Sequence, residues 1–147
     1  MALAIRGSTA RKLWPCAALA VVCSIASCDA YNESVGDHFR LMATDTLAEL
    51  ALYHFDGEVY VGVVGPKVTA IGYDERHILV RQDPAPHRRK SGLAPPYFYL
   101  VTIEPEPSEF PRSIQGPMTH AELLKARETN GVAAELVLRD VPLRPPK

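Results

Sequence analysis

The sequence is poor in cysteine, with only Cys16, Cys23 and Cys28 among its 147 residues. All three lie near the start, so no disulfide can form within residues 29–147, and packing alone must hold a folded domain there. A Gly-x-Ser-x-Gly nucleophile motif is also absent, as is a glycine-rich phosphate loop followed by lysine. With neither kind of catalytic motif, we expect a protein that is not an enzyme.

The sequence also lacks an apolar run long enough to be a membrane-spanning helix. Its longest run, Leu13–Ala26, is interrupted by Pro15, and a bilayer core needs about 20 apolar residues. The basic residues Arg6, Arg11 and Lys12 precede the run, and no acidic residue does. This order of a positive start, a short apolar middle and small residues predicts a secretory signal peptide.

The apolar run ends in Ile25, Ala26, Ser27 and Cys28, which resemble the lipobox of bacterial lipoproteins. The resemblance implies removal of residues 1–27, a diacylglyceryl group on the Cys28 thiol and a further acyl chain on its amine, with no other cofactor. Two or more chains matter because each buried methylene contributes about 0.8 kcal/mol and one chain anchors only marginally. We therefore expect a lipid-anchored protein of the bacterial cell envelope that faces the periplasm. Asp29 resembles an inner-membrane retention signal and slightly favours that membrane.

The mature chain would have no excess of positive charge. Removing Arg6, Arg11 and Lys12 leaves 13 basic residues against 17 acidic ones, a net charge of −4. Nucleic-acid binding needs a basic surface, so we expect no nucleic-acid partner. Conventional cleavage after Ala30 stays open as an alternative to lipidation.

The length of the mature chain suits one domain with one core. Residues 28–36 are short and polar and are expected to be a lipidated, flexible tether. Residues 37–143 are expected to form a single globular domain, followed by a loose tail at 144–147.

Alternating apolar and polar residues predict strands over much of this domain. The Asp56-Gly57 pair between two such segments indicates a hairpin, because the favoured turn needs positive φ at both central residues. The proline-rich stretch 104–117 is expected to be extended and solvated. The expected strands are 39–44, 50–55, 58–64, 67–73, 77–82, 97–103 and 136–141.

One helix is expected near the end of the chain. Thr119 and Glu122 have the spacing of a capping box, and Gly131 is a natural left-handed stop. Its expected buried side consists of Ala121, Leu123 and Leu124. The sequence thus predicts an α+β fold, mainly an antiparallel β-sheet of five to seven strands with one short C-terminal helix.

A second resemblance concerns the segment from Val68 to Val80, together with Tyr97–Leu100 and Gly116–Thr119. It is similar to the strand-turn-strand core of small bacterial envelope lipoproteins of unknown function. This resemblance implies no particular activity.

Candidate catalytic and metal-ligating residues are scattered. Asp74 and Glu75 are adjacent, but they lie where a hairpin turn needs polar residues, so we expect solvated charges and no catalytic pair. A zinc site needs three or four converging ligands, and the histidines lack ligand spacing, so we expect no metal. They are His38, His54, His77, His87 and His120.

The candidate partner-binding residues are Arg88, Arg89, Lys90, Tyr97 and Tyr99. The first three form the one basic cluster of the mature chain, in a proline-bounded loop that either reaches an acidic partner or is simply solvated. The two tyrosines belong to a strand with aromatic residues on both faces, which are either sheet core or a contact surface.

The expected function is therefore a non-enzymatic binding or interaction domain whose partner is another envelope protein. One alternative is a periplasmic inhibitor or immunity protein, which should project an ordered loop at 83–96. Another is a hydrolase with an unrecognised site, which would need a concave pocket that gathers titratable groups. A binding domain should instead expose an apolar patch, expected near Tyr97.

Overall fold

The structure of the protein, a computed structural model, describes residues 31–103 and 113–141. The expected signal peptide, the lipidation residue Cys28 and the expected tail at 144–147 lie outside the described residues.

The described strands form two antiparallel sheets, which confirms the predicted fold class. The first sheet has the order β1-β2-β3-β4 and the second has the order β8-β7-β6-β5-β9. One α-helix, α1, follows β8. The elements are β1 (Tyr31–Val35), β2 (Phe39–Ala43), β3 (Ala51–Phe55), β4 (Tyr60–Val64), β5 (Val68–Tyr73), β6 (His77–Gln82), β7 (Tyr97–Thr102), β8 (Ile114–Met118), α1 (His120–Thr129) and β9 (Arg139–Asp140).

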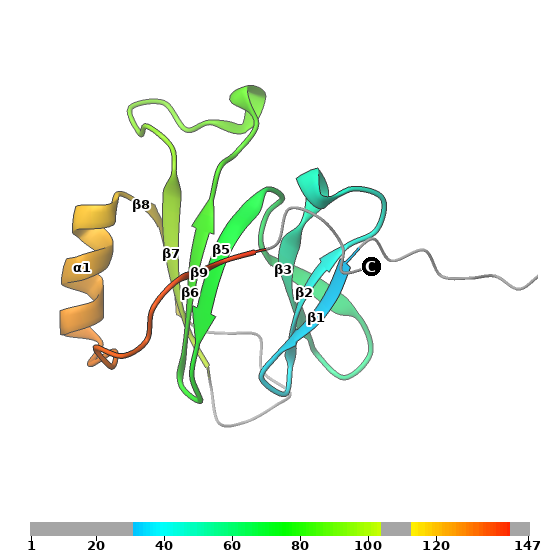
Figure 1. Cartoon of the computed structure of the whole chain (residues 1–147), viewed down its shortest axis with the longest axis horizontal. Coiled ribbons are helices and arrows are strands. Elements are labelled where there is room, and N and C mark those ends of the chain that lie inside the picture. The colour runs from blue at the N-terminus through cyan, green and yellow to red at the C-terminus, as the bar shows by residue number, and fades with distance from the viewer. Residues whose placement is uncertain (1–30, 104–112, 142–147) are drawn as a thin grey trace, which may run out of the picture.

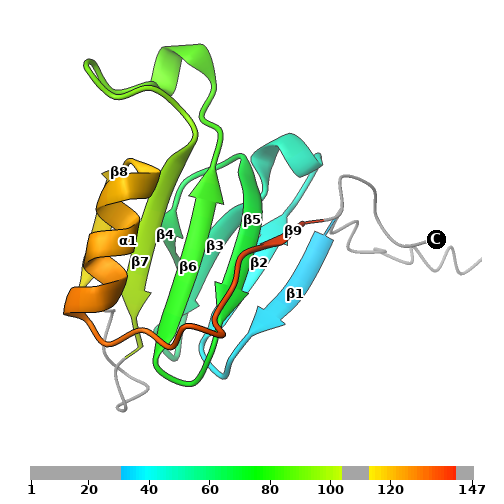
Figure 2. The same ribbon diagram turned by 60° about the vertical axis from the view of Figure 1, so that its left-hand side comes forward.

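The elements stack in three layers. The two sheets face each other, and α1 covers the opposite face of the second sheet (Figure 1). Strand β6 shows why the second sheet is apolar on both faces: Ile78 and Val80 pack in the core between the sheets, whereas Leu79 packs in the core beneath α1. The outer face of the first sheet has no layer over it among the described residues (Figure 2).

The hairpin predicted at Asp56-Gly57 is confirmed, but the expected turn type is wrong, because Asp56 lacks a positive φ and the connection spans the four residues 56–59. Gly57 has a positive φ of 104°, and the Asp56 amide donates to the carbonyl of Val59 at 3.2 Å. The Asp56 carboxylate also accepts the amides of Val59 and Glu58, both at 2.9 Å. These backbone hydrogen bonds lower the pKa of Asp56. Local turn chemistry therefore joins β3 to β4.

The predicted helix and its capping box are also confirmed. The Thr119 hydroxyl accepts the Glu122 amide, and the Glu122 carboxylate accepts the Thr119 amide at 2.7 Å. That hydrogen bond lowers the pKa of Glu122. The expected buried side is correct for Leu123 but wrong for Ala121 and Leu124, which are exposed. Successive helical residues are about 100° apart, and only a narrow stripe of α1 rests on the sheet.

The expected tether is wrong for residues 31–35, which form the edge strand β1. Val35 is buried in the core between the sheets, and the Glu33 carboxylate forms an ion pair with Arg139 of β9. Burial raises the pKa of Tyr31 to about 12, and the hydrogen bond from its hydroxyl to Glu33 adds to the shift. Strand β1 of the first sheet thus lies near β9 of the second (Figure 2), and its charged residue is paired between the two sheets.

Two further expectations are corrected near the end of the chain. Strand β8 occupies part of the stretch expected to be solvated, and it tolerates Pro117 because it lies at a sheet edge. The final strand is limited to β9, since Leu136 packs beneath α1 and Val141 packs between the sheets. The chain must therefore cross the edge of the second sheet between these two residues.

Candidate interaction loop

Residues 83–96 connect β6 to β7 and project beyond the end of the second sheet (Figure 1). The Asp83 amide donates to the Lys67 carbonyl at 2.9 Å, which fixes the base of the loop. The first half of the loop contains a 3-10 turn, Pro86–Arg88, in which the Arg88 amide donates to the carbonyl of Ala85 at 2.8 Å. The inhibitor alternative requires an ordered projecting loop, and this segment is one.

The Tyr97 side chain supports the second half of the loop through hydrogen bonds to its backbone. Its side chain is 1% exposed, and its hydroxyl accepts the Lys90 amide at 2.6 Å. The same hydroxyl donates to the Leu93 carbonyl at 3.1 Å. One buried phenol thus satisfies a backbone donor and a backbone acceptor of the loop, which ties its tip to the core.

Tyr99, two residues further along β7 and on the same face as Tyr97, supports the base of the loop. Its hydroxyl donates to the side-chain carbonyl of Gln82 at 2.9 Å, and the Gln82 amide donates to the carbonyl of Pro66 at 2.8 Å. Burial, followed by the nearby Tyr97, raises the pKa of Tyr99. The loop base is therefore bound to the turn between β4 and β5.

The structure places four of the five predicted partner-binding residues in the loop or in contact with it, and places Tyr99 below its base. Arg88, Arg89 and Lys90 are exposed at the tip. The expectation of an aromatic contact surface at Tyr97 is corrected, because a buried ring offers a partner no surface. Gln82 was missed by sequence reasoning; its signal is a polar residue at the end of an otherwise apolar strand.

The basic tip has no acidic partner among the described residues. No carboxylate of residues 31–103 or 113–141 forms an ion pair with Arg88, Arg89 or Lys90. Guanidinium groups present forked donors that match carboxylates and phosphates, often through two parallel hydrogen bonds. The tip can therefore bind an anionic surface.

The expected exposed apolar patch lies elsewhere. Val59, just before β4, and Tyr60 and Val61 at its start are 57%, 42% and 36% exposed. The β7 strand, which was expected to carry the patch, is largely buried. The patch sits at the free edge of the first sheet.

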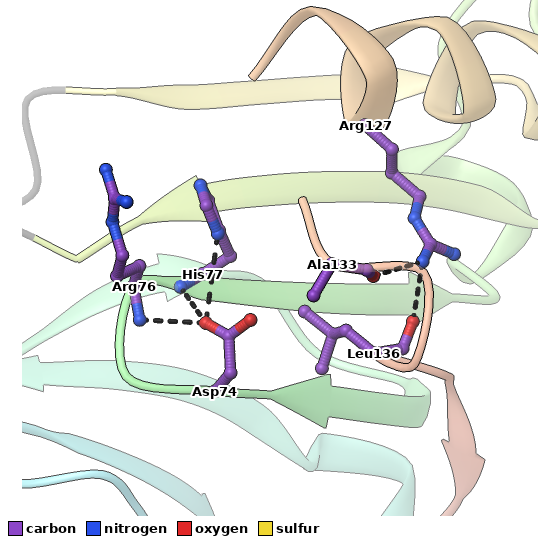
Figure 3. Close-up of polar contacts among 6 residues, drawn as sticks. All are labelled: Asp74, Arg76, His77, Arg127, Ala133 and Leu136. Carbon is purple, nitrogen blue, oxygen red and sulfur yellow. Dashed lines mark hydrogen bonds and ion pairs between the residues drawn. The ribbon is translucent and has the colours of Figure 1, made fainter. Parts of the chain in front are cut away.

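The turn between β5 and β6 is built around Asp74. One oxygen of its carboxylate accepts the amides of Arg76 and His77, both at 2.8 Å, and lies 3.8 Å from the His77 imidazole (Figure 3). The carboxylate thus stabilises the turn, as expected for this position.

Two hollows flank this turn. The one on the helix side, of about 500 Å³, reaches the segment that Arg127 holds by donating to the carbonyls of Ala133 and Leu136 at 2.9 and 2.8 Å (Figure 3). The one toward the first sheet, of about 480 Å³, gathers titratable groups from two hairpin turns. These groups are Asp37, His38, Tyr73, Asp74 and Glu75.

The second hollow has one property expected of a hydrolase site, since it collects side chains that are distant in sequence. Its carboxylates are poorly suited to acid–base work, however, because Asp37 and Glu75 are exposed and Asp74 is engaged by the turn. No group of three or more histidine, cysteine, aspartate or glutamate residues in the described part of the chain is placed to hold a metal ion.

Known protein families, curated proteins and solved structures yield no match to this chain. Among residues 31–103 and 113–141, no helix has both the length and the apolar character to span a membrane.

Proposed function

We propose that the chain is a lipid-anchored protein of the bacterial cell envelope whose domain binds, without catalysis, an acidic surface of another envelope protein. The binding element is the loop 83–96, and Cys28 is the anchor. The observation that carries the proposal is the double hydrogen bond of the buried Tyr97 hydroxyl to Lys90 and Leu93.

A supported loop matters because binding costs the freedom of the groups that become ordered. A mobile basic loop would lose backbone and side-chain entropy on association, whereas a loop already tied to the core has lost much of it before binding. The charge distribution adds selectivity, since a mature chain of net charge −4 concentrates three cations at one projection. An acidic partner would be attracted to the tip and repelled by most of the remaining surface.

The second candidate is a periplasmic inhibitor or immunity protein, and the same projecting loop favours it. Such a protein must insert an ordered segment into or beside a target site, and 83–96 extends beyond the sheets (Figure 1). A hydrolase at the hollow lined by Asp37 and Glu75 is the weaker alternative, because these two carboxylates are exposed and that of Asp74 supports a turn.

The binding proposal can be tested by site-specific photo-crosslinking in intact cells that produce the full chain. A photoreactive residue at Ser91, beside the tip, should give one discrete protein adduct, whereas the same residue at Lys125 on α1 should not. Reversing the tip charges with Arg88→Glu, Arg89→Glu and Lys90→Glu should reduce the Ser91 adduct at least tenfold.

The control reverses two exposed charges elsewhere, with Arg76→Glu and Lys125→Glu, and should leave the Ser91 adduct unchanged. An adduct that survives reversal of the tip would refute binding through the basic loop. If the adduct contains an enzyme whose activity the purified chain lowers, the inhibitor candidate replaces the general one.

The anchor is tested by the intact mass of the chain extracted from membranes. We expect a chain that begins at Cys28 and carries the added mass of its acyl groups, and we expect Cys28→Ser to abolish this species. A processed chain with an unmodified thiol would contradict the anchor while leaving the loop proposal standing.

A further inference from the structure

Strand β4 ends the first sheet, and no strand of the described residues pairs with its outer edge. Natural edge strands are usually protected by charged residues, proline or a covering segment. From Val59 to Val64 the chain has no charged residue and no proline. The opposite edge strand, β1, differs in that its Glu33 is paired with Arg139 of β9.

The hydrogen bonding of β3 reveals which backbone groups of β4 face outward. The Phe55 amide donates to the His38 carbonyl at 2.7 Å, so the backbone groups of Phe55 point toward β2. Phe55 lies opposite Tyr60, and Tyr53 lies opposite Gly62. Because hydrogen-bonded and non-hydrogen-bonded pairs alternate in antiparallel strands, Tyr60 and Gly62 present their N–H and C=O groups to the open edge.

The side chains at this edge are complementary in size. The Tyr60 ring lies on the outer face of the sheet, 5.0 Å from the Phe55 ring and 6.0 Å from the Arg40 guanidinium. Gly62 leaves a gap on the same face, since a Cβ placed there would lie no closer than 4.0 Å to Tyr53. The edge therefore offers a large ring and, two residues away, space for one.

We infer that β4 is a self-association site that pairs antiparallel with β4 of a second copy of this chain. In the pairing that the outward backbone groups allow, Tyr60 of each copy lies opposite Gly62 of the other, with two hydrogen bonds in each pair. Each ring covers the other copy's glycine gap, and Val61 meets Val61 at the two-fold axis. The two first sheets join into one continuous sheet.

A second copy fits this edge because the edge is complementary to itself. Closed two-fold pairing is the commonest symmetry of homo-oligomers and uses the same surface on both copies. The fit of each Tyr60 ring to the other copy's Gly62 favours two copies in this register over slipped arrangements.

Disulfide trapping of Val61→Cys tests the inference. At the two-fold axis the two cysteines form a non-hydrogen-bonded pair with Cα atoms about 4.5 Å apart, within the range a disulfide spans. Membranes from cells that produce the full chain are treated with a mild oxidant. We expect a covalent dimer at a yield at least fivefold above that of the control Val137→Cys, which replaces a more exposed valine (65%) outside β4.

A second change separates specific pairing from chance collision. Tyr60→Lys, added to Val61→Cys, places a cation at each of the two ring positions and should reduce the dimer at least fivefold, whereas Tyr60→Phe should preserve it. Equal trapping of Val61→Cys and Val137→Cys, or insensitivity to Tyr60→Lys, overturns the inference. A disulfide to a different protein also overturns it, because the edge would then belong to another partner.

Discussion

Tyr97→Phe is the substitution that most directly tests the role of the loop support. The change keeps the buried ring and removes only the hydroxyl that accepts the Lys90 amide at 2.6 Å and donates to the Leu93 carbonyl at 3.1 Å. We expect the sheet and helix to persist while the loop tip separates from the core. The Ser91 adduct described above should therefore become weaker without any change of charge.

The expected cost follows from the two hydrogen bonds. A net contribution of about 0.5–1.5 kcal/mol for each bond gives a loss of about 1–3 kcal/mol in the free energy of unfolding. Lys90 is exposed and Leu93 is partly exposed, so water can replace some of the lost partners. The loss should consequently fall in the lower half of that range, about 1–2 kcal/mol.

Urea unfolding measures this loss, and amide hydrogen exchange locates it. Exchange should become faster at Lys90 and its loop neighbours, with little change in β6 or in α1. Tyr99→Phe is the matched control, because it removes a second partly buried phenol whose hydroxyl binds Gln82 and no loop backbone. It should leave exchange at Lys90 unchanged. If Tyr97→Phe lowers stability without faster exchange in the loop, or leaves the Ser91 adduct intact, the support role is refuted.

A pH titration and two glycine substitutions probe the packing. Burial, with a smaller contribution from a nearby histidine, lowers the pKa of His54 below 6.5 in the folded protein, so the unfolded chain binds a proton first as pH falls. The free energy of unfolding should therefore decrease from about pH 6.5 downward. In urea titrations, His54→Gln should make that decrease smaller. Gly72→Ala should lower the free energy of unfolding by about 1–3 kcal/mol, because its methyl group would overlap the Val137 carbonyl. Gly62→Ala has room and should change it by less than about 1 kcal/mol; equal losses would contradict this account.

Much of the fold was predictable because its signals are short-range. The turn after β3 follows from Asp56 and Gly57, and the start of α1 follows from Thr119 and Glu122, where each partner is within three residues of the other. Strand alternation was equally visible where the strands are apolar. Strand β1 was missed because its polar residues, such as Glu33, are typical of a flexible tether. The ion pair that Glu33 forms is with Arg139, a residue far along the chain.

The sequence could predict which residues take part in the candidate site, but not how they are arranged. The basic cluster and the two tyrosines can be recognised in the sequence, and one of the tyrosines, Tyr97, does hold the basic loop. Alternation along the strand places Tyr97 and Tyr99 on the same face of β7. It does not reveal whether each hydroxyl contacts solvent or backbone, because that depends on the path of the loop 83–96. Gln82 joined the site only because β6 and β7 are neighbours.

By itself the sequence determined the β3–β4 turn and the capped helix, because their hydrogen bonds join residues a few positions apart, and the apolar strands, because their residues alternate. Only the tertiary structure decided how the strands divide between two sheets, that Tyr97 supports the basic loop from inside, and that β4 retains an open edge. These outcomes depend on contacts between segments far apart in the chain, where packing and backbone pairing select one arrangement among several that the same local pattern allows.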